Sequence, residues 1–423
     1  MSRAIAPLKS LIENWLHNRT FAIWAASILT VLIRLGAGFA FKTYRFDTAN
    51  DHWALGYEWG RVAKWLVESS MYTLNGSSAG AIVEPLYPFT IAVFFYVFGL
   101  FTTSAAVSLI VFQSLLCGLN TWVLFILTER IYGPLEARVC SFLFALYPAS
   151  IFFAVARIGP TSLTALLLCL ILLLTLILFE HPRTSWAILA GSLTGLLFLT
   201  GAHPFSLIGI VPLWLLWVDK NRRLRMFLVS LIFVASAIFI TMPWAVRNSL
   251  MLGRPTMSKT GLGLMLWKGN NPVATGYTQV RSPDGELGPE DDIHLQMAVS
   301  WIADNPKDFA ALTMKRILYF WTAIPRSSSG LELLNGLFFM VLTVLGVFGA
   351  FSPEERAEGI WLLLLFVAIF PIVFYITVIS HYRYRFYIEP LILVLASRGI
   401  IRLWQRVSPL VVSFPSPWFC RSR

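Results

Sequence analysis

The chain has 423 residues, of which 57% are hydrophobic and 13% are charged, against roughly 45–50% and about 25% in an average soluble domain. This composition excludes a soluble fold of one or two domains. The 33 Lys and Arg outnumber the 22 Asp and Glu, for a net charge of +11, but they form short runs between apolar stretches. Nucleic-acid binding would need a single basic stripe, whereas short runs such as residues 219–225 follow the positive-inside rule of multi-span membrane proteins.

The first apolar stretch, residues 20–41, follows Arg3, Lys9 and Arg19. It is too long for the apolar region of a cleaved signal peptide, and no small-residue cleavage site follows it. We therefore expect an uncleaved first transmembrane helix, with residues 1–19 in the cytoplasm. Three of the four cysteines lie inside apolar runs, so a disulfide framework is not expected.

The later apolar runs are long enough to cross about 30 Å of hydrocarbon. They are residues 105–127, 137–155, 162–179, 226–245, 331–351, 359–379 and 387–403. The run 186–218 is too long for one crossing and is interrupted at His203 and Pro204, so it predicts two short spans joined by a turn. The pattern predicts an all-α polytopic protein with about ten transmembrane helices.

Residues 87–101 form a shorter apolar run. If the basic loop 219–225 is cytoplasmic, counting spans places both ends of this run on the same side of the membrane. We expect this run to be a juxtamembrane or re-entrant helix. Two large external segments follow from that topology, the second of them helix-like over residues 291–321. The expected organisation is a cytoplasmic N-terminus (1–19), a transmembrane module (20–245) containing the first external loop (42–104), a large external loop (246–330), C-terminal transmembrane helices (331–403) and a cytoplasmic tail (404–423).

Acidic residues outside the cytoplasm concentrate in the first external loop. They are Asp47, Asp51, Glu58, Glu68 and Glu84. If residues 51–68 are helical, Asp51 and Glu58 lie on one face two turns apart. A carboxylate at the membrane surface can act as a general base toward an acceptor hydroxyl or amine. The alternative is the solvated face of an amphipathic helix lying in the interface.

A second group of charges consists of arginines at the outer ends of predicted spans, where the positive-inside rule disfavours them. They are Arg157, Arg247, Arg383 and Arg385. The planar guanidinium suits phosphate oxygens, and an anionic lipid carrier would present a phosphate at that depth. The alternative is snorkelling to ordinary headgroups. Arg34, inside the first span, is a functional candidate by default to which the sequence assigns no role.

The sequence lacks a Walker-type phosphate loop, a CxxC pair and an HExxH motif, which removes support from ATP-driven transport and zinc proteolysis. Two or three carboxylates would suffice to hold a divalent ion through oxygen ligands. No spacing identifies such a site, so no metal ligand is assigned and the cofactor stays open.

Seven segments, taken together, resemble a known family. They are GYEWGRVAKWLVES (56–69), EPLYPFTIAVFFYVFG (84–99), LYPASIFFAVARIGPTSL (146–163), MPWAVRNSLMLGRP (242–255), GNNPVATG (269–276), NPKDFAALTMKRILYFW (305–321) and YRYRFYIEPLI (382–392). In order and spacing they resemble the GT-C superfamily of membrane glycosyltransferases, nearest to bacterial members of its protein-mannosyltransferase and aminoarabinose-transferase branch. The resemblance covers most of the chain.

The resemblance implies a transferase that moves a sugar from a polyprenyl-phosphate donor to a lipid, glycan or protein acceptor. The active site is then expected on the external, periplasmic face of the inner membrane, between the first loop and the loop at Arg157. A first-loop acid would act on the acceptor, and the span-end arginines would hold the lipid phosphate. The resemblance also supports the non-spanning interpretation of residues 87–101.

The sequence departs from this family pattern at two places. Leu55 stands where many relatives carry an Asp, so Glu58, one helical turn on, is the first candidate base, Asp51 the second, and Glu84 an assisting acid. The loop at Arg157 lacks an acid that relatives often have there, which weakens the case for a two-carboxylate metal site. Asn270 and Asn271 would bind sugar hydroxyls or cover the site, or else form a plain turn.

Two other classes of function remain open at this point. A secondary transporter would explain many spans with charges inside them, although the repeated halves typical of such proteins are not evident. A non-catalytic membrane partner of a polysaccharide export system would explain the large external loop without any role for Glu58 and Arg157.

Overall fold

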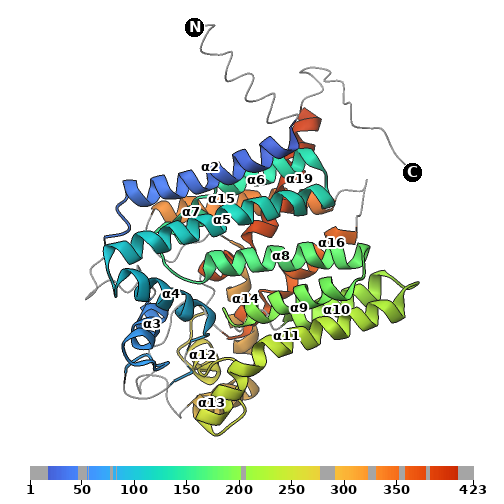
Figure 1. The fold of residues 1–423 in the computed structure, drawn as a ribbon. Coiled ribbons are helices and arrows are strands. Elements are labelled where there is room, and N and C mark those ends of the chain that lie inside the picture. The colour runs from blue at the N-terminus through green and yellow to red at the C-terminus, as the bar shows by residue number, and fades with distance from the viewer. Residues whose placement is uncertain are drawn as a thin grey trace.

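The computed structural model describes residues 18–45, 55, 57–76, 80–81, 83–201, 206–276, 291–322, 330–351, 358–377 and 382–407 (Figure 1). Throughout these residues the regular structure is helical and no strand occurs. The prediction of an all-α fold is therefore confirmed.

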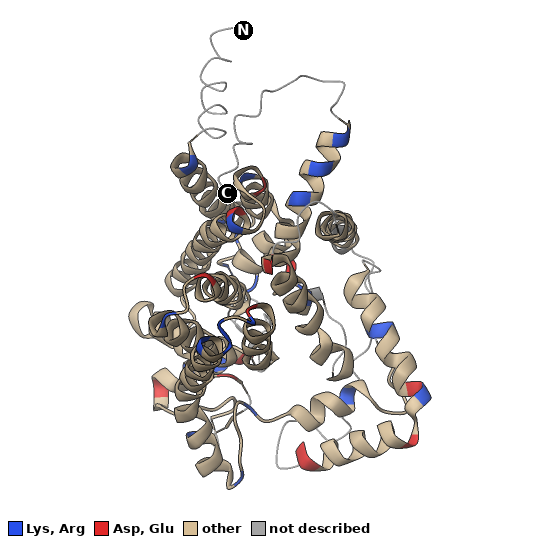
Figure 2. Cartoon of the chain, turned by 90° about the vertical axis from the view of Figure 1, so that its right-hand side faces the viewer, with Lys and Arg blue, Asp and Glu red and all other residues tan. Residues whose placement is uncertain are grey.

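Long apolar helices make up the body of the molecule. By length and composition, six stretches of the described residues can each cross a membrane, or seven if one bent helix pair counts as a single span. Four of the six are α2 (Arg19–Ala40), α5 (Thr103–Ile131), α8 (Thr161–Glu180) and α11 (Arg223–Leu252). The other two are Leu333–Ala350 of α15 (Gly330–Ala350) and the pair α16 (Glu358–Ile369) and α17 (Ile372–Thr377). Figure 2 shows the charged residues sparsely placed along these helices.

Shorter helices complete the bundle and its surroundings. They are α3 (Tyr57–Ser69), α4 (Leu86–Phe98), α6 (Pro134–Leu146), α7 (Pro148–Val155), α9 (Thr184–Phe198), α10 (Leu207–Val218), α12 (Leu262–Gly269), α13 (Asp291–Asp304), α14 (Pro306–Trp321), α18 (Tyr382–Arg385) and α19 (Glu389–Val407). The helices α3, α4, α12 and α13 lie together at the lower left of Figure 1. Glu58 lies on α3, Glu84 just before α4, and Asn270 and Asn271 directly after α12.

Helix α4 covers the run that sequence reasoning expected not to span. Its 13 residues make a helix of about 20 Å at 1.5 Å per residue, against about 30 Å of hydrocarbon. The length of α4 therefore agrees with a juxtamembrane or re-entrant helix. The run 186–218 is divided between α9 and α10, while His203 and Pro204 lie outside the described residues.

One expected span is broken. The run 137–155 forms α6 and α7, which are bent by 50° relative to each other, because Pro148 at the start of α7 cannot continue the hydrogen bonding of α6. The fully buried Arg34 of α2 lies at this break, where its guanidinium donates to the carbonyl oxygens of Phe144 (3.2 Å) and Ala145 (3.3 Å). It also donates to the Ser150 hydroxyl at 2.6 Å. Arg34 thus satisfies backbone groups that lipid would leave without partners.

Prolines account for two further breaks. Pro371 separates α16 from α17, and Pro306 separates α13 from α14 within the predicted helical stretch 291–321. In the second case proline takes the first position of the new helix, where its missing N–H costs nothing. The stretch 291–321 therefore contains two helices where the sequence suggested one continuous stretch.

Candidate active site

Glu58 lies in the first turn of α3, a helix within the stretch 42–104 that the sequence predicts to be the first external loop. The positive end of the helix dipole favours a carboxylate at this position. The buried face of α3 carries Val62 and Ala63, which are almost fully shielded from solvent, and this face orients the helix against its neighbours. The Glu58 side chain is half-buried. Asp51, the second candidate base, lies outside the described residues.

Trp59 brings α3 against the loop that contains Arg157. A Cβ atom placed on Gly159 would come within 3.2 Å of the Trp59 ring, so the indole packs directly on the backbone of this loop. Trp59 also meets the Tyr87 ring of α4 edge to face, with 6.4 Å between the ring centroids. Arg157, two residues before Gly159, is 9% exposed. The residue next to Glu58 therefore contacts the loop that carries the first of the candidate phosphate-binding arginines.

The buried Gln113 of α5 fixes the shape of this loop. Its Oε1 accepts a hydrogen bond from the Tyr87 hydroxyl at 2.9 Å and one from the Gly159 N–H at 3.4 Å. Its Nε2 donates to the Ala154 carbonyl at 2.9 Å. Because Gln113 is fully buried, these bonds are protected from water and hold the end of α7 and the following loop in one arrangement.

Glu84 forms an ion pair with Lys259, a residue that the sequence analysis did not single out. The Lys259 Nζ lies 2.9 Å from Glu84 Oε1, and the carboxylate side chain is only 5% exposed. Burial of the ammonium lowers the pKa of Lys259, but the negative charges of Glu84 and Glu58 raise it by more, so this pKa lies above its ordinary value. Glu58 and Glu84, two of the candidate acids of the first loop, are therefore within electrostatic reach of one lysine.

The segment around Lys259 is tied to α11 and to the first loop. The Ser258 carbonyl accepts hydrogen bonds from Trp244 Nε1 at 2.9 Å and from Asn248 Nδ2 at 2.7 Å. The Thr260 N–H donates to the Ala81 carbonyl at 2.7 Å. These bonds flank Lys259 on both sides, so its backbone has a defined position.

Arg247 of α11 holds the same part of the first loop. Its Nη1 donates to the Gly80 carbonyl at 2.7 Å and to Asn248 Oδ1 at 2.9 Å. The guanidinium also lies over the rings of Trp244 (4.8 Å) and Tyr72 (5.3 Å). Arg247 is thus partly engaged in joining α11 to the first loop.

Arg385 of α18 lies in a buried ion pair. Its Nε is 2.8 Å from Glu389 Oε1, with both side chains at most 4% exposed. The guanidinium carbon lies 3.6 Å from the centre of the Phe339 ring. The neighbouring Tyr384 is among the groups that raise the pKa of Lys259, after Glu84 and Glu58. Arg383 belongs to the same short helix, but its side chain is not among those described.

Asn270 and Asn271 are both buried and bonded within the fold. Asn270 Nδ2 donates to the carbonyls of Leu266 and Ile376, each at 2.9 Å. Asn271 Nδ2 donates to the Trp267 carbonyl at 2.8 Å. The Asn270 Oδ1 accepts from the fully buried Arg316 of α14 at 3.1 Å. The two amides therefore shape the end of α12, and Arg316 supports them from a position that sequence reasoning did not identify.

The comparisons with known proteins bear on the fold of this chain. Residues 83–246 match the family model described as dolichyl-phosphate-mannose-protein mannosyltransferase. The oligosaccharyltransferase of Archaeoglobus fulgidus in its apo form is similar at a TM-score of 0.57 and 12% identity, over 93% of this chain and 52% of that one. The archaeal AglB of the same organism, in complex with an inhibitory peptide and a dolichol-phosphate, gives 0.56 and 12% over 93% and 51%.

The chain has a GT-C fold. This GT-C chain spans about half the length of the oligosaccharyltransferases that it matches. ArnT from Cupriavidus metallidurans bound to undecaprenyl phosphate superposes less closely, with a TM-score of 0.43 and 14% identity over 92% of this chain and 81% of that one. A search of the curated proteins finds no match.

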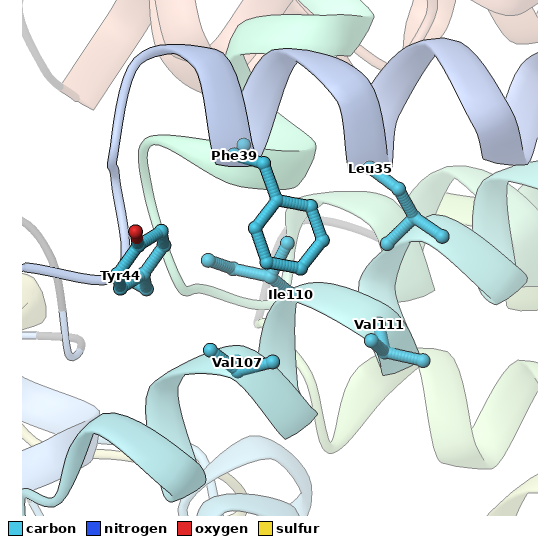
Figure 3. Close-up of a pocket in the computed structure, with 7 residues that line it drawn as sticks. Leu35, Phe39, Tyr44, Val107, Ile110 and Val111 are labelled. Carbon is cyan, nitrogen blue, oxygen red and sulfur yellow. The ribbon is translucent and has the colours of Figure 1, made fainter.

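The GT-C chain also contains an apolar pocket that is separate from the candidate site residues. It lies between α2 and α5, where Leu35, Phe39, Ile110 and Val111 line it and Tyr44 closes one side (Figure 3). Apart from Tyr44, its lining offers no group that titrates or binds a phosphate. Within the described part of the chain, no three His, Cys, Asp or Glu side chains are grouped as metal ligands would be.

Lys259 and Arg316 are two cations of this region that could not be identified from the sequence. The predicted phosphate-binding cations are arginines at the ends of spans, whereas Lys259 lies in a loop and Arg316 in helix α14. The one available signal for Lys259 was its positive charge on the side of the membrane where the positive-inside rule disfavours it.

Proposed function

We propose that this GT-C chain is a membrane glycosyltransferase that moves a sugar from a polyprenyl-phosphate donor to an acceptor on the external face. The observation that carries the proposal is the contact of Trp59 with Gly159, because it sets the acid-bearing helix α3 beside the loop of Arg157. A base for the acceptor and a cation for the phosphate are then supplied by adjacent segments. The AglB of A. fulgidus, which has a similar fold, binds a dolichol-phosphate and a peptide, which supports a donor of the same chemical class.

In the proposed reaction Glu58 takes the proton from the acceptor nucleophile. The nucleophile forms a bond to the anomeric carbon while the bond from that carbon to the phosphate oxygen breaks, so the configuration inverts. The polyprenyl phosphate leaves with one additional negative charge. Asp51 and Glu84 are the acids that would assist, through position and charge.

Cations would stabilise the charge that develops on the leaving phosphate, which is usually the largest electrostatic contribution to catalysis. We assign this role to Arg157 first, because it lies in the loop that Trp59 contacts. Arg247 and Arg385 already bind Gly80 and Glu389, so each would offer the phosphate only the remaining donors of its guanidinium. Arg383 is retained as a fourth candidate, and Asn270 and Asn271 would shape the loop that covers the site.

We further propose that the protein lies in the inner (plasma) membrane with the site facing the periplasm. Residues 1–19 and 404–423 would then be cytoplasmic, and residues 42–104 and 246–330 external. The support is the distribution of basic residues, since the loop 219–225 and the C-terminal tail are rich in Lys and Arg. The acceptor would be a lipid, glycan or protein reached from outside.

The experiment is transfer by the purified protein from a radiolabelled pool of polyprenyl-phosphate sugars. We expect release of polyprenyl phosphate by the wild type, and a kcat at least about 10-fold lower in Arg157→Ala. Arg183→Ala, at an exposed position, is the matched control and should keep wild-type activity. Absence of turnover with every lipid-linked sugar would refute the proposal and favour a transporter or a non-catalytic partner.

A further inference from the structure

The ion pair between Lys259 and Glu84 joins the two external segments on either side of the candidate site. Glu84 lies within the first loop, just before α4, and Lys259 lies in the connection between α11 and α12. We propose, on the basis of the proposed glycosyl transfer, that Lys259 is a positioning residue which holds Glu84 in place and leaves Glu58 as the base. The two acids would then have different tasks.

The burial of Glu84 makes it dependent on its partner. A carboxylate that is 5% exposed loses most of its hydration, and removing the cation would leave an uncompensated buried charge. Glu58 differs, because it is half-buried and no ion pair within 4 Å is found for it among the described residues. Lys259 influences Glu58 only at longer range. The more accessible acid is therefore the one suited to receive a proton from an acceptor.

The fold fixes the position of Lys259 independently of Glu84. Its neighbours Ser258 and Thr260 are held by α11 and by the first loop, as described above. On the far side, the Asp291 carboxylate of α13 accepts hydrogen bonds from the N–H groups of Gly261 (2.9 Å) and Leu264 (3.0 Å). Asp291 thereby caps the start of α12. The ammonium is presented to Glu84 from a braced loop, as a positioning residue requires.

The proposal predicts coupling between the two side chains, which thermal unfolding measures without any assay of activity. Lys259→Met and Glu84→Gln should each lower the Tm, and the double variant should be less destabilised than the sum of the two, because neither charge is left unpaired. The matched control is the exposed pair Lys64–Glu68 on α3, at 3.7 Å, where the corresponding Lys64→Met and Glu68→Gln should have little effect. Additive losses at Lys259 and Glu84 would overturn the ion-pair assignment.

The wild type and the three variants of the Lys259–Glu84 cycle, together with Lys259→Arg, then test positioning through kcat and KM. We expect Lys259→Met to lower kcat about 10- to 100-fold with little change in donor KM. Lys259→Arg should keep most of the wild-type kcat. In the Glu84→Gln background, Lys259→Met should have a smaller effect on kcat. A large rise in donor KM at unchanged kcat would overturn the proposal, since Lys259 would then bind the donor directly. Thermal coupling without turnover by the wild type would refute the glycosyl transfer and reduce the pair to a structural contact.

Discussion

Polar residues near the candidate site differ in how many of their hydrogen-bonding groups already have partners inside the fold. Asn270 and Arg316 are fully buried and bonded to each other and to backbone carbonyls. Arg385 is buried against Glu389. Glu58 is half-buried in the first turn of α3. The residues with internal partners shape the site, and the proposal therefore assigns the proton transfer to Glu58.

Substitution of Asn270 should affect stability more than substrate binding. Asn270→Ala removes the acceptor of Arg316 and the donor to the Leu266 and Ile376 carbonyls, which should lower the free energy of unfolding by about 2 kcal/mol. Thermal unfolding and donor KM measure the two effects separately. An unchanged Tm with a strongly raised KM would instead indicate direct binding of the sugar.

The pH dependence of the Lys259–Glu84 pair has a definite sign. Because the folded-state pKa of Lys259 is raised above its ordinary value of 10.5, the stabilisation is complete below that pH and is lost as the pH rises further. The Tm difference between wild type and Lys259→Met should therefore be constant from neutral pH to about 10 and then narrow. Glu84, Glu58 and Tyr384 are the groups that act on the ammonium, and they are present in both proteins. A Tm difference that already narrows between pH 8 and pH 10 would contradict the assignment.

At the level of elements, the apolar runs predicted the helices well and the breaks less well. The runs 105–127, 162–179 and 226–245 lie within α5, α8 and α11, and α5 and α11 extend beyond them because polar residues continue a helix outside the hydrocarbon. The bend at Pro148 was missed although the proline lies inside the run 137–155, because that run is mostly apolar. The contacts of Arg34 at the bend were missed because Arg34 comes from α2 and is distant in sequence. The contact of Lys259 with Glu84 was missed for the same reason. Residue types and periodicity predict elements, but they do not identify which distant side chains meet.

The bend between α6 and α7 should depend on Arg34. Arg34→Met leaves the carbonyls of Phe144 and Ala145 without their donor, which should cost about 3 kcal/mol of unfolding free energy. The control is Arg130→Met, because Arg130 forms an exposed ion pair with Glu180 of the kind that contributes about 0–1 kcal/mol. Equal losses of stability in the two variants, measured in the same detergent, would show that Arg34 has no special role at the bend.

The whole molecule combines a GT-C bundle with a region built from α3, α4, α12 and α13, which we propose to be external. In the proposed topology, the net charge of +11 is divided between basic loops and tails on the cytoplasmic side and a smaller set of cations close to the first loop. Composition alone indicated a membrane protein, and the resemblance indicated the superfamily. Neither could predict the arrangement of Glu58, Glu84 and Lys259, because it depends on how segments far apart in the chain pack together.

The orientation of the molecule can be tested with its own cysteines. Cys117, Cys140 and Cys169 are buried, whereas Cys420 lies in the basic tail that the positive-inside rule places in the cytoplasm. A membrane-impermeant maleimide should therefore label the protein only after the inner membrane is permeabilised. Labelling of Cys420 in intact spheroplasts would reverse the proposed topology and place the candidate site on the cytoplasmic side.

The most direct measurement of the central claim compares Glu58→Gln with Glu68→Gln. Both substitutions remove one carboxylate from α3, but Glu68 lies in the exposed pair with Lys64. With saturating polyprenyl-phosphate sugar, we expect kcat to fall at least about 100-fold in Glu58→Gln and to stay within two-fold of wild type in Glu68→Gln. Wild-type turnover by a correctly folded Glu58→Gln protein would contradict the account.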